Sequence, residues 1–149
     1  MLSSDYLTCS REQVKEVLPH RAPLLLVDEA PAVEPGVRAA ASLYVDPNWD
    51  IFRGHFPGAP VLPGIYSIEA MAQTTDLVLL TLPAYAGKEP LLLGADKAKF
   101  YRKIVPGDTL AISAELVSER KEKAIGTCRC EIHVDGELMA AVEITIAVR

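Results

Sequence analysis

The longest nearly apolar stretch of the chain runs from Pro63 to Leu82. Its composition predicts one helix, because proline suits a first helical turn and Pro83 would end the run. About twenty residues with a rise of 1.5 Å each would form a rod of roughly 30 Å, the diameter of a small domain. A helix this long and this apolar has to be enclosed by the rest of the protein.

Strand-like patterns separated by turn residues make up most of the remaining chain. Two such segments precede the helix and four follow it: residues 24–33, 37–45, 91–105, 109–121, 124–134 and 137–148. The last segment alternates most clearly, which is typical of an antiparallel strand with one buried side. A short N-terminal helix is also expected, because Ser10 and Gln13 have capping-box spacing. The pattern predicts an α+β fold in which a six-stranded antiparallel sheet wraps around a long central helix.

Length and composition limit the classes of protein that fit. The 149 residues with 50% hydrophobic content are expected to form a single domain, residues 1–149, with a sizeable core. The net charge of −5 argues against nucleic acid or an anionic membrane as partner, because both need a basic excess. A signal-peptide pattern and a run long enough to span a bilayer are both lacking, so we expect a cytoplasmic protein.

The cysteines do not predict a disulfide scaffold or a metal centre. Three cysteines are too few and oddly numbered for disulfide pairing, so free thiols are expected. Strand alternation would place Cys128 and Cys130 on one face and His133 on the other. This arrangement favours buried strand cysteines over metal ligands.

Two side chains suited to acid/base chemistry flank the start of the long helix. His55 lies in a loop constrained by glycine and proline, and Glu69 lies inside the otherwise apolar helix. Histidine titrates near neutral pH, whereas a carboxyl among apolar groups tends to keep its proton. Together they are predicted to act as a proton acceptor and a proton donor in one site. Taken singly, His55 also fits a structural loop histidine.

The polar residues of the long helix form one stripe, because Glu69, Gln73 and Asp76 fall at positions i, i+4 and i+7. Both a solvated face and the polar wall of a site fit this stripe. Gln73 could orient the carboxyl of Glu69, bind a site water or simply pack. Gly64 lies where the helix begins, so its N–H lies unpaired at the positive end of the helix dipole and could hold an oxyanion.

Five runs of sequence, the third of which continues through Glu69 to Gln73, carry a resemblance that is specific when they are read together. These runs are Leu18-Pro19-His20-Arg21, Leu24-Leu25-Leu26-Val27-Asp28, Gly54-His55-Phe56-Pro57-Gly58, Asp96-Lys97-Ala98-Lys99-Phe100 and Pro106-Gly107-Asp108. Over nearly its whole length the chain resembles the β-hydroxyacyl-[acyl-carrier-protein] dehydratases of the FabZ type. In the sister FabA type the acid is an aspartate, so Glu69 favours the FabZ branch.

The resemblance implies a hot-dog fold, in agreement with the pattern of elements. It implies conversion of a (3R)-3-hydroxyacyl thioester on acyl carrier protein to the trans-2-enoyl thioester and water in fatty acid biosynthesis. His55 would be the base, Glu69 the acid and the N–H of Gly64 the oxyanion donor. The resemblance also implies a homodimer or a trimer of dimers, in which facing His55 and Glu69 come from different protomers. This reaction needs neither a metal nor a redox cofactor.

Other residues fit roles in binding the acyl chain and its carrier. Phe56 and Ile65 could line an apolar tunnel for the acyl chain, or belong to the core. A basic cluster on this otherwise acidic chain could steer an acidic carrier protein, or be a solvated strand face. The cluster consists of Lys97, Lys99, Arg102 and Lys103.

Two positions depart from the pattern of the family. Ala22 stands where a large aromatic residue is usual, and Ala59 where a basic residue is usual. These departures leave open a dehydratase of a specialised pathway, acting on polyketide or coenzyme A thioesters. An enzyme that also isomerises trans-2 to cis-3 products fits as well. The alternative from another class is a non-catalytic hot-dog module that binds acyl carriers, although a pure binder needs neither a base nor an acid.

Overall fold

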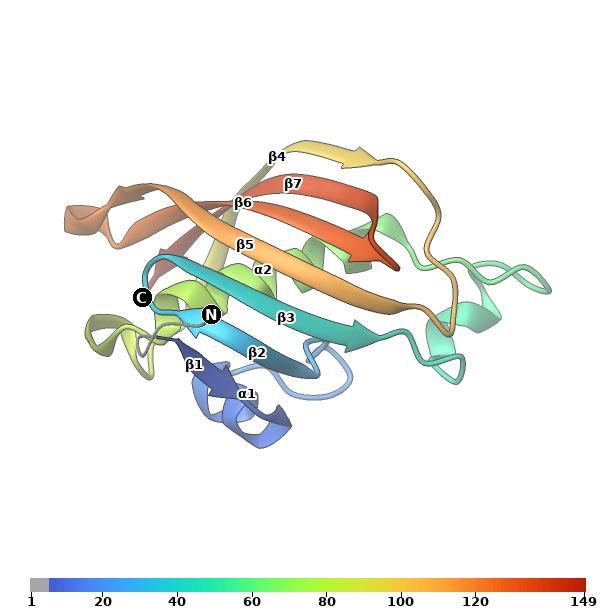
Figure 1. The fold of residues 1–149 in the computed structure, drawn as a ribbon, viewed down its shortest axis with the longest axis horizontal. Helices are drawn as coiled ribbons and strands as arrows, with labels where there is room; N and C mark the ends of the chain where they lie inside the picture. The colour runs from blue at the N-terminus through green and yellow to red at the C-terminus, as the bar shows by residue number, and fades with distance from the viewer. Residues whose placement is uncertain (1–5) are drawn as a thin grey trace.

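A computed structural model describes residues 6–149 as an antiparallel sheet curved around one long helix (Figure 1). The seven strands lie in the order β1-β2-β3-β5-β6-β7-β4. They are β1 (Leu7–Cys9), β2 (Glu29–Glu34), β3 (Arg38–Tyr44), β4 (Pro90–Phe100), β5 (Thr109–Arg120), β6 (Ile125–Val134) and β7 (Glu137–Val148). The helices are α1 (Arg11–Val17) and α2 (Gly64–Leu80), with short 3₁₀ helices η1 (Asp50–Arg53), η2 (Pro83–Tyr85) and η3 (Lys121–Lys123). The predicted hot-dog architecture is confirmed, with one strand more than expected.

Helix α2 supplies the centre of the core. Its side chains Met71, Leu77 and Leu79 are buried and belong to one apolar cluster with Ile112 of β5 and Ile144 of β7. Burying one large aliphatic side chain stabilises the fold by about 1.5–3 kcal/mol, so a cluster of this kind holds α2 firmly against the sheet. No helix within residues 6–149 is long and apolar enough to cross a membrane.

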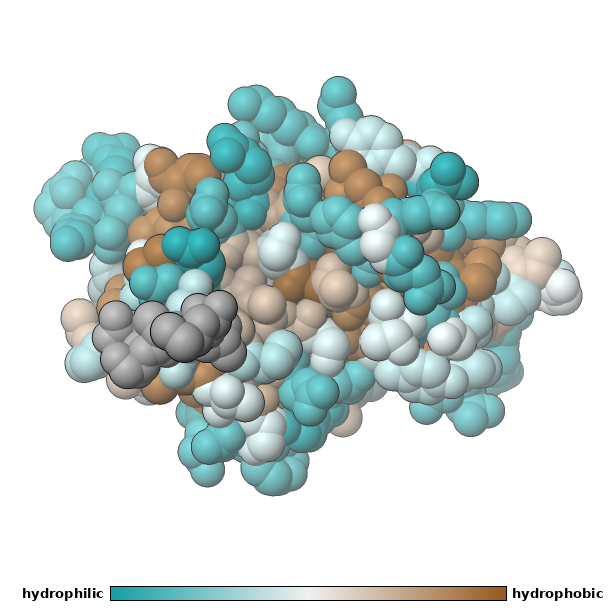
Figure 2. Space-filling model, viewed as in Figure 1, coloured by the Kyte–Doolittle hydropathy of each residue, from teal (hydrophilic) through white to brown (hydrophobic). Residues whose placement is uncertain are grey.

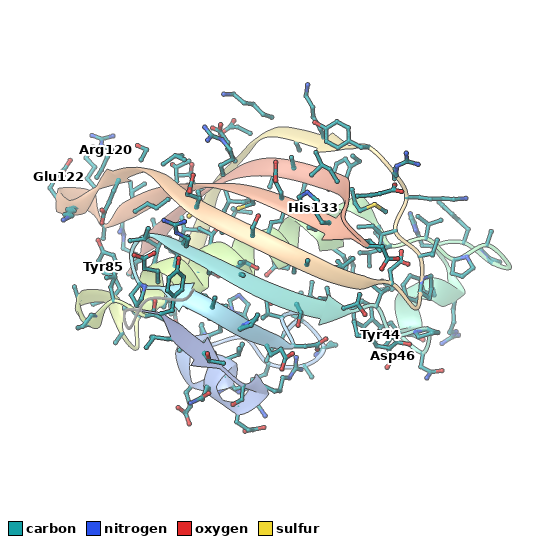
Figure 3. All side chains as sticks on the ribbon, in the orientation of Figure 1. Tyr44, Asp46, Tyr85, Arg120, Glu122 and His133 are labelled. Atoms are coloured by element: carbon teal, nitrogen blue, oxygen red, sulfur yellow. The ribbon has the colours of Figure 1, made fainter. Side chains whose placement is uncertain are left out.

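The strand cysteines lie as the alternation predicts. Cys128 and Cys130 are buried on the face of β6 that meets α2, where the Sγ of Cys130 lies 3.2 Å from the Oγ1 of Thr75. His133 belongs to the opposite face of the same strand (Figure 3). Burial raises the pKa of both thiols to about 12, so they stay protonated at neutral pH.

The structure corrects the strand predicted over residues 24–33, because β2 begins only at Glu29. Leu26 and Val27 are buried, but their N–H groups donate to the side chain of Gln73 and not to a neighbouring strand. This apolar run has the composition of a strand, but its backbone N–H groups are bound by a distant side chain, so it is not one. Strand β1 has only three residues, too few for a periodic signal.

Strand β4 forms one edge of the sheet and leaves most of its side chains exposed. Leu91, Leu92 and Leu93 are 48%, 51% and 56% exposed, and Phe100 at the other end of the strand is 52% exposed. An edge strand with unpaired backbone groups and apolar side chains is a template for pairing with another chain.

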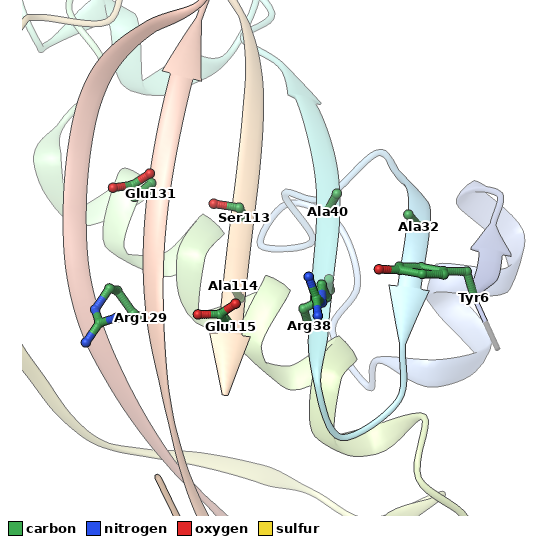
Figure 4. A pocket seen from close by; sticks show the side chains of 10 residues that line it. Tyr6, Ala32, Arg38, Ala40, Ser113, Ala114, Glu115, Arg129 and Glu131 are labelled. Atoms are coloured by element: carbon green, nitrogen blue, oxygen red, sulfur yellow. The ribbon is translucent and has the colours of Figure 1, made fainter. Parts of the chain in front are cut away.

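Small side chains hollow the outer face of the sheet (Figure 2), and a close view of the hollow shows α2 behind the strands (Figure 4). The hollow has a volume of about 440 Å³, and Ala32, Ala40 and Ser113 are among the residues that line it. Arg38 and Arg129 add charge to its lining. None of the predicted site residues lines this hollow, so the candidate chemistry lies elsewhere in the molecule.

Candidate active site

A hydrogen bond fixes the ring of His55 in the loop between η1 and α2. Its Nδ1 lies 2.7 Å from the carbonyl oxygen of Val61. Because a carbonyl oxygen can only accept, Nδ1 carries a proton, and in the neutral ring Nε2 keeps the lone pair. The ring of Phe56 stacks on the imidazole with a centroid separation of 4.0 Å. The imidazole is therefore held in the tautomer that a general base needs.

Gly64 begins α2 beside this imidazole. Its N–H has no hydrogen-bond acceptor within residues 6–149, and it lies at the positive end of the helix dipole. A Cβ on Gly64 would lie 3.1 Å from the ring of Phe100, so any larger residue at the start of α2 would push this ring away by a few tenths of an ångström. Both His55 and Gly64 line one pocket of about 420 Å³, together with Ser67 and Phe100. The candidate base and the candidate oxyanion donor thus share one pocket.

Four hydrogen bonds fix the amide of Gln73, which is fully buried. Its Oε1 accepts from the N–H of Leu26 at 2.9 Å and of Val27 at 3.3 Å. Its Nε2 donates to the carbonyl oxygen of Leu24 at 2.7 Å and to Oε2 of Glu69 at 2.8 Å. The two backbone donors settle which end of the amide is oxygen, so an N–H faces Glu69. Gln73 therefore orients the carboxyl and ties the loop to α2.

The polar stripe of α2 is not a solvated face. It runs from Glu69, whose side chain is 30% exposed, to Asp76, which is only 3% exposed. His20, from the loop after α1, joins it: its Nε2 lies 3.7 Å from Oε2 of Glu69 and 3.9 Å from Oδ2 of Asp76. The sequence pattern gives His20 no role of its own, because no spacing rule links that loop to a distant helix.

Asp76 is a buried carboxyl with an unpaired oxygen. Burial raises its pKa well above the usual range, and a negative charge on Glu69 raises it further whenever that neighbour is ionised. Its Oδ1 has no hydrogen-bond partner among residues 6–149, and neither has Nδ1 of His20. An ionised carboxylate with such an oxygen would be costly, so Asp76 holds its proton at neutral pH.

We expect Asp76→Asn to gain stability relative to the wild type as pH rises. Folded Asp76 keeps a proton that the unfolded chain releases above about pH 4, so unfolding releases a proton and stability falls with rising pH. The fall is at most about 1.4 kcal/mol per pH unit, and asparagine removes it. Thermal melts from pH 4 to pH 8 at fixed protein concentration measure the difference in Tm. A constant difference would contradict a protonated Asp76.

Within one chain, the candidate base and acid open into different pockets. Glu69 lines a pocket of about 260 Å³ with Leu24, Ile65 and Tyr66, whereas His55 lines the pocket at the start of α2. Ile65 is 73% exposed and Leu24 50%. Large apolar side chains left open around a carboxyl are suited to being covered by an acyl chain or by a second protomer.

A larger pocket of about 650 Å³ adjoins that of Glu69, because Tyr66 lines both. Ala22 lies in its wall, and the aromatic side chains of Tyr44 and Trp49 also line it. The departure from the family pattern at Ala22 therefore coincides with open space beside the candidate acid.

The predicted basic cluster is partly neutralised. The Nζ of Lys97 lies 3.4 Å from a carboxylate oxygen of Glu143, and the Nε of Arg102 lies 2.8 Å from one of Glu137. The other two cations of the cluster make no ion pair within residues 6–149. The part of the cluster able to attract an acidic partner is thus smaller than the sequence suggests.

Comparison with known proteins gives consistent matches over most of the chain. The family model described as FabA-like domain matches residues 18–143. The 3-hydroxyacyl-[acyl-carrier-protein] dehydratase FabZ of Pelotomaculum thermopropionicum is 45% identical over 137 residues, 92% of this chain and 96% of that protein. The protein of the same name from Clostridium acetobutylicum is 42% identical over 142 residues, 95% of this chain and 99% of that protein.

Solved structures show the same fold. The dehydratase heterocomplex ApeI:P from Xenorhabdus doucetiae matches with a TM-score of 0.77 at 20% identity, over 91% of this chain and 90% of that one. The sigma28-regulated virulence protein Cj0977 from Campylobacter jejuni matches with a TM-score of 0.67 at 15% identity, over 93% of this chain and 88% of that one. At these identities the likeness concerns the fold alone.

Proposed function

The chain belongs to the FabA-like family and is a dehydratase of the FabZ type, and from this premise we propose how its residues remove water from a (3R)-3-hydroxyacyl thioester on acyl carrier protein. His55 takes the proton from C2, and Glu69 gives a proton to the C3 hydroxyl, which leaves as water. The product is the trans-2-enoyl thioester of fatty acid biosynthesis. The observation that carries the proposal is the pair of fixed groups, an imidazole with a free Nε2 and a carboxyl held by Gln73.

The hydrogen bond from Gln73 selects the oxygen of Glu69 that acts as the acid. Oε2 accepts the N–H of Gln73, so the acid proton is carried by Oε1. When Glu69 gives this proton away, the same N–H faces a carboxylate, and hydrogen bonds to ionised groups are about twice as strong as neutral ones. Gln73 therefore stabilises the product state of the proton transfer more than the starting state.

The pocket of His55 suits the other half of the reaction. Removal of the weakly acidic C2 proton places negative charge on the thioester oxygen, which the N–H of Gly64 would stabilise. The carbonyl of Val61 accepts from Nδ1 and stabilises the imidazolium that forms. One positioned base typically contributes about 10² to 10⁴ in rate, and one oxyanion donor about 10² to 10³.

Two exposed apolar side chains near these groups are proposed to contact the acyl chain. Phe56 is 52% exposed and stacks on the imidazole, and Ile65 is exposed beside Glu69. Burial of each side chain under an acyl chain would contribute about 25 cal/mol per Å² of apolar surface removed from water.

We further propose that the working unit is a dimer formed by pairing two β4 edges, and that three such dimers can associate. Pairing would satisfy the open backbone of β4 and cover its leucines. The start of α2 packs on β4 through Gly64 and Phe100, so pairing there would bring both helix starts together. The pocket of His55 in one protomer would then meet the pocket of Glu69 in its partner.

Incubation with (3R)-3-hydroxyacyl carrier proteins of several chain lengths tests the reaction directly. Mass spectrometry follows the loss of water, and chromatography separates trans-2 from cis-3 enoyl products. We expect the trans-2 product, whereas unchanged substrate at every chain length would contradict the proposal.

We also propose a cytoplasmic location. The three buried free thiols support it, because cysteines stay reduced in that compartment.

Charge reversal at Lys103 should weaken the use of carrier-protein substrates. Lys103 lines the pocket of His55 and makes no ion pair within the described residues. Lys103→Glu is expected to raise KM roughly 3-fold to 10-fold at low salt and less at high salt, because exposed charge pairs are weak and screened. KM for the matching coenzyme A thioester should change less.

Lys121→Glu is the matched control for this prediction. Lys121 lies in η3, at the end of the molecule opposite the loop that carries His55 (Figure 1). The same change of net charge there is expected to leave KM within about twofold. A rise in KM that does not depend on salt, or one that Lys121→Glu shares, would show that Lys103 is not part of a docking surface.

A further inference from the structure

One nitrogen of His20 faces two carboxyls. Its Nε2 lies 3.7 Å from Oε2 of Glu69 and 3.9 Å from Oδ2 of Asp76, while its buried Nδ1 has no partner among residues 6–149. The ring proton is therefore placed on Nε2, where acceptors are present. Burial lowers the pKa of His20; Glu69 raises it in part and Arg21 lowers it. A neutral imidazole thus has a single N–H to offer to either carboxyl.

Asp76 does not compete strongly for that N–H. Burial raises the pKa of Asp76 well above its usual range and so favours the neutral carboxyl, and hydrogen bonds to a charged acceptor are stronger than those to a neutral one. The titratable groups that face Asp76 are His20, Glu69 and the thiols of Cys128 and Cys130 on β6, and both thiols are neutral. No cation pairs with Asp76 within the described residues. The N–H of His20 is therefore drawn towards whichever neighbour becomes an anion.

We propose that His20 is a positioning residue for Glu69 and supplies a second N–H to Oε2, beside that of Gln73. This role rests on the proposed function of Glu69 as the acid. Two donors on Oε2 keep the acid proton on Oε1, and both gain strength when Glu69 becomes a carboxylate. The gap of 3.7 Å exceeds a hydrogen bond, but catalytic contacts often tighten only when substrate binds. The side chain of Glu69 is partly exposed, which leaves room for a small shift towards His20 that keeps the hydrogen bond to Gln73.

His20→Phe tests the role, because phenylalanine keeps a ring and removes the N–H. We expect kcat to fall roughly 10-fold to 100-fold with KM within about twofold, the pattern for an interaction that strengthens in the transition state. His20→Gln restores an N–H at similar reach and should recover a large part of kcat. A purely structural role would give the opposite order, with the ring-preserving variant as the better enzyme.

Comparing His20→Phe with unchanged His20 in the Asp76→Asn protein decides whether His20 acts on Glu69 or only on Asp76. Asp76→Asn alone should keep kcat within about threefold at pH 7, because asparagine replaces a neutral group. If His20 serves Glu69, His20→Phe lowers kcat by a similar factor in this background. If the loss disappears there, His20 is only the partner of Asp76 and the proposal is overturned. A His20→Phe enzyme with full kcat overturns it as well.

Glu69→Gln separates this inference from the function on which it rests. If Glu69→Gln is inactive and His20→Phe is fully active, only the role of His20 fails. If Glu69→Gln retains its activity, the assignment of the acid fails and the role of His20 fails with it. Each assay uses the same (3R)-3-hydroxyacyl carrier protein, with circular dichroism and oligomer size as controls for folding.

Discussion

Glu69→Gln is expected to lower kcat at least about 10²-fold while KM changes little. Glutamine has nearly the same size, and its side-chain oxygen can still accept the N–H of Gln73, so the local structure should persist. Its amide N–H groups are not acidic, so it has no proton that it can transfer to the departing hydroxyl, which is a poor leaving group. His55→Ala should reduce kcat to a similar extent, because it removes the base for C2. The measurement is the initial rate of enoyl thioester formation.

Glu122→Gln is the matched control for the loss of a carboxylate. Glu122 is exposed in η3, at the end of the sheet opposite Tyr44 (Figure 3). Its replacement should leave kcat unchanged within error. If Glu69→Gln or His55→Ala retained most of its activity with an intact fold, that residue would have no place in the chemistry.

The fold is predictable because its elements follow local periodicities. Helix α2 has an apolar composition bounded by Pro63 and Pro83, and the structure places it from Gly64 to Leu80. Along β7, alternation separates the buried Val142 and Ile144 from their partly exposed neighbours. Periods of this kind depend only on neighbouring residues, so they can be read before any tertiary contact is known.

The candidate site is less predictable because its geometry depends on contacts between distant residues. Spacing within α2 aligns Gln73 with Glu69, and their hydrogen bond follows. The same spacing cannot show that Gln73 also binds the backbone of Leu26, or that His20 approaches from a separate loop. Nor does polar spacing distinguish a wet face from the buried stripe that leads to Asp76. Burial of polar groups is decided by what packs over them, which local sequence does not contain.

If each active site joins His55 of one protomer to Glu69 of its partner, a mixture of two inactive variants should give a result that neither variant gives alone. His55→Ala and Glu69→Gln protomers should each be nearly inactive alone but active when co-expressed. In a mixed dimer, one shared site carries both defects, and the other joins an intact His55 to an intact Glu69 across the interface. Random pairing makes half of the dimers mixed, each with one working site of two, so activity should return to about a quarter of wild type.

This recovery depends on geometry and not on stability. If base and acid came from the same protomer, every site in the mixture would keep one defect, and activity would stay at the mean of the two residual rates. The protein carrying both substitutions in one chain, co-expressed with wild type, is the control. Its mixed dimers contain an intact base and an intact acid only in one and the same chain. They should therefore be inactive, which leaves about a quarter of wild-type activity from wild-type dimers alone. If the control instead gave about half of wild-type activity and the first mixture gave none, His55 and Glu69 of the same chain would belong to one site. That result would exclude a site shared between protomers.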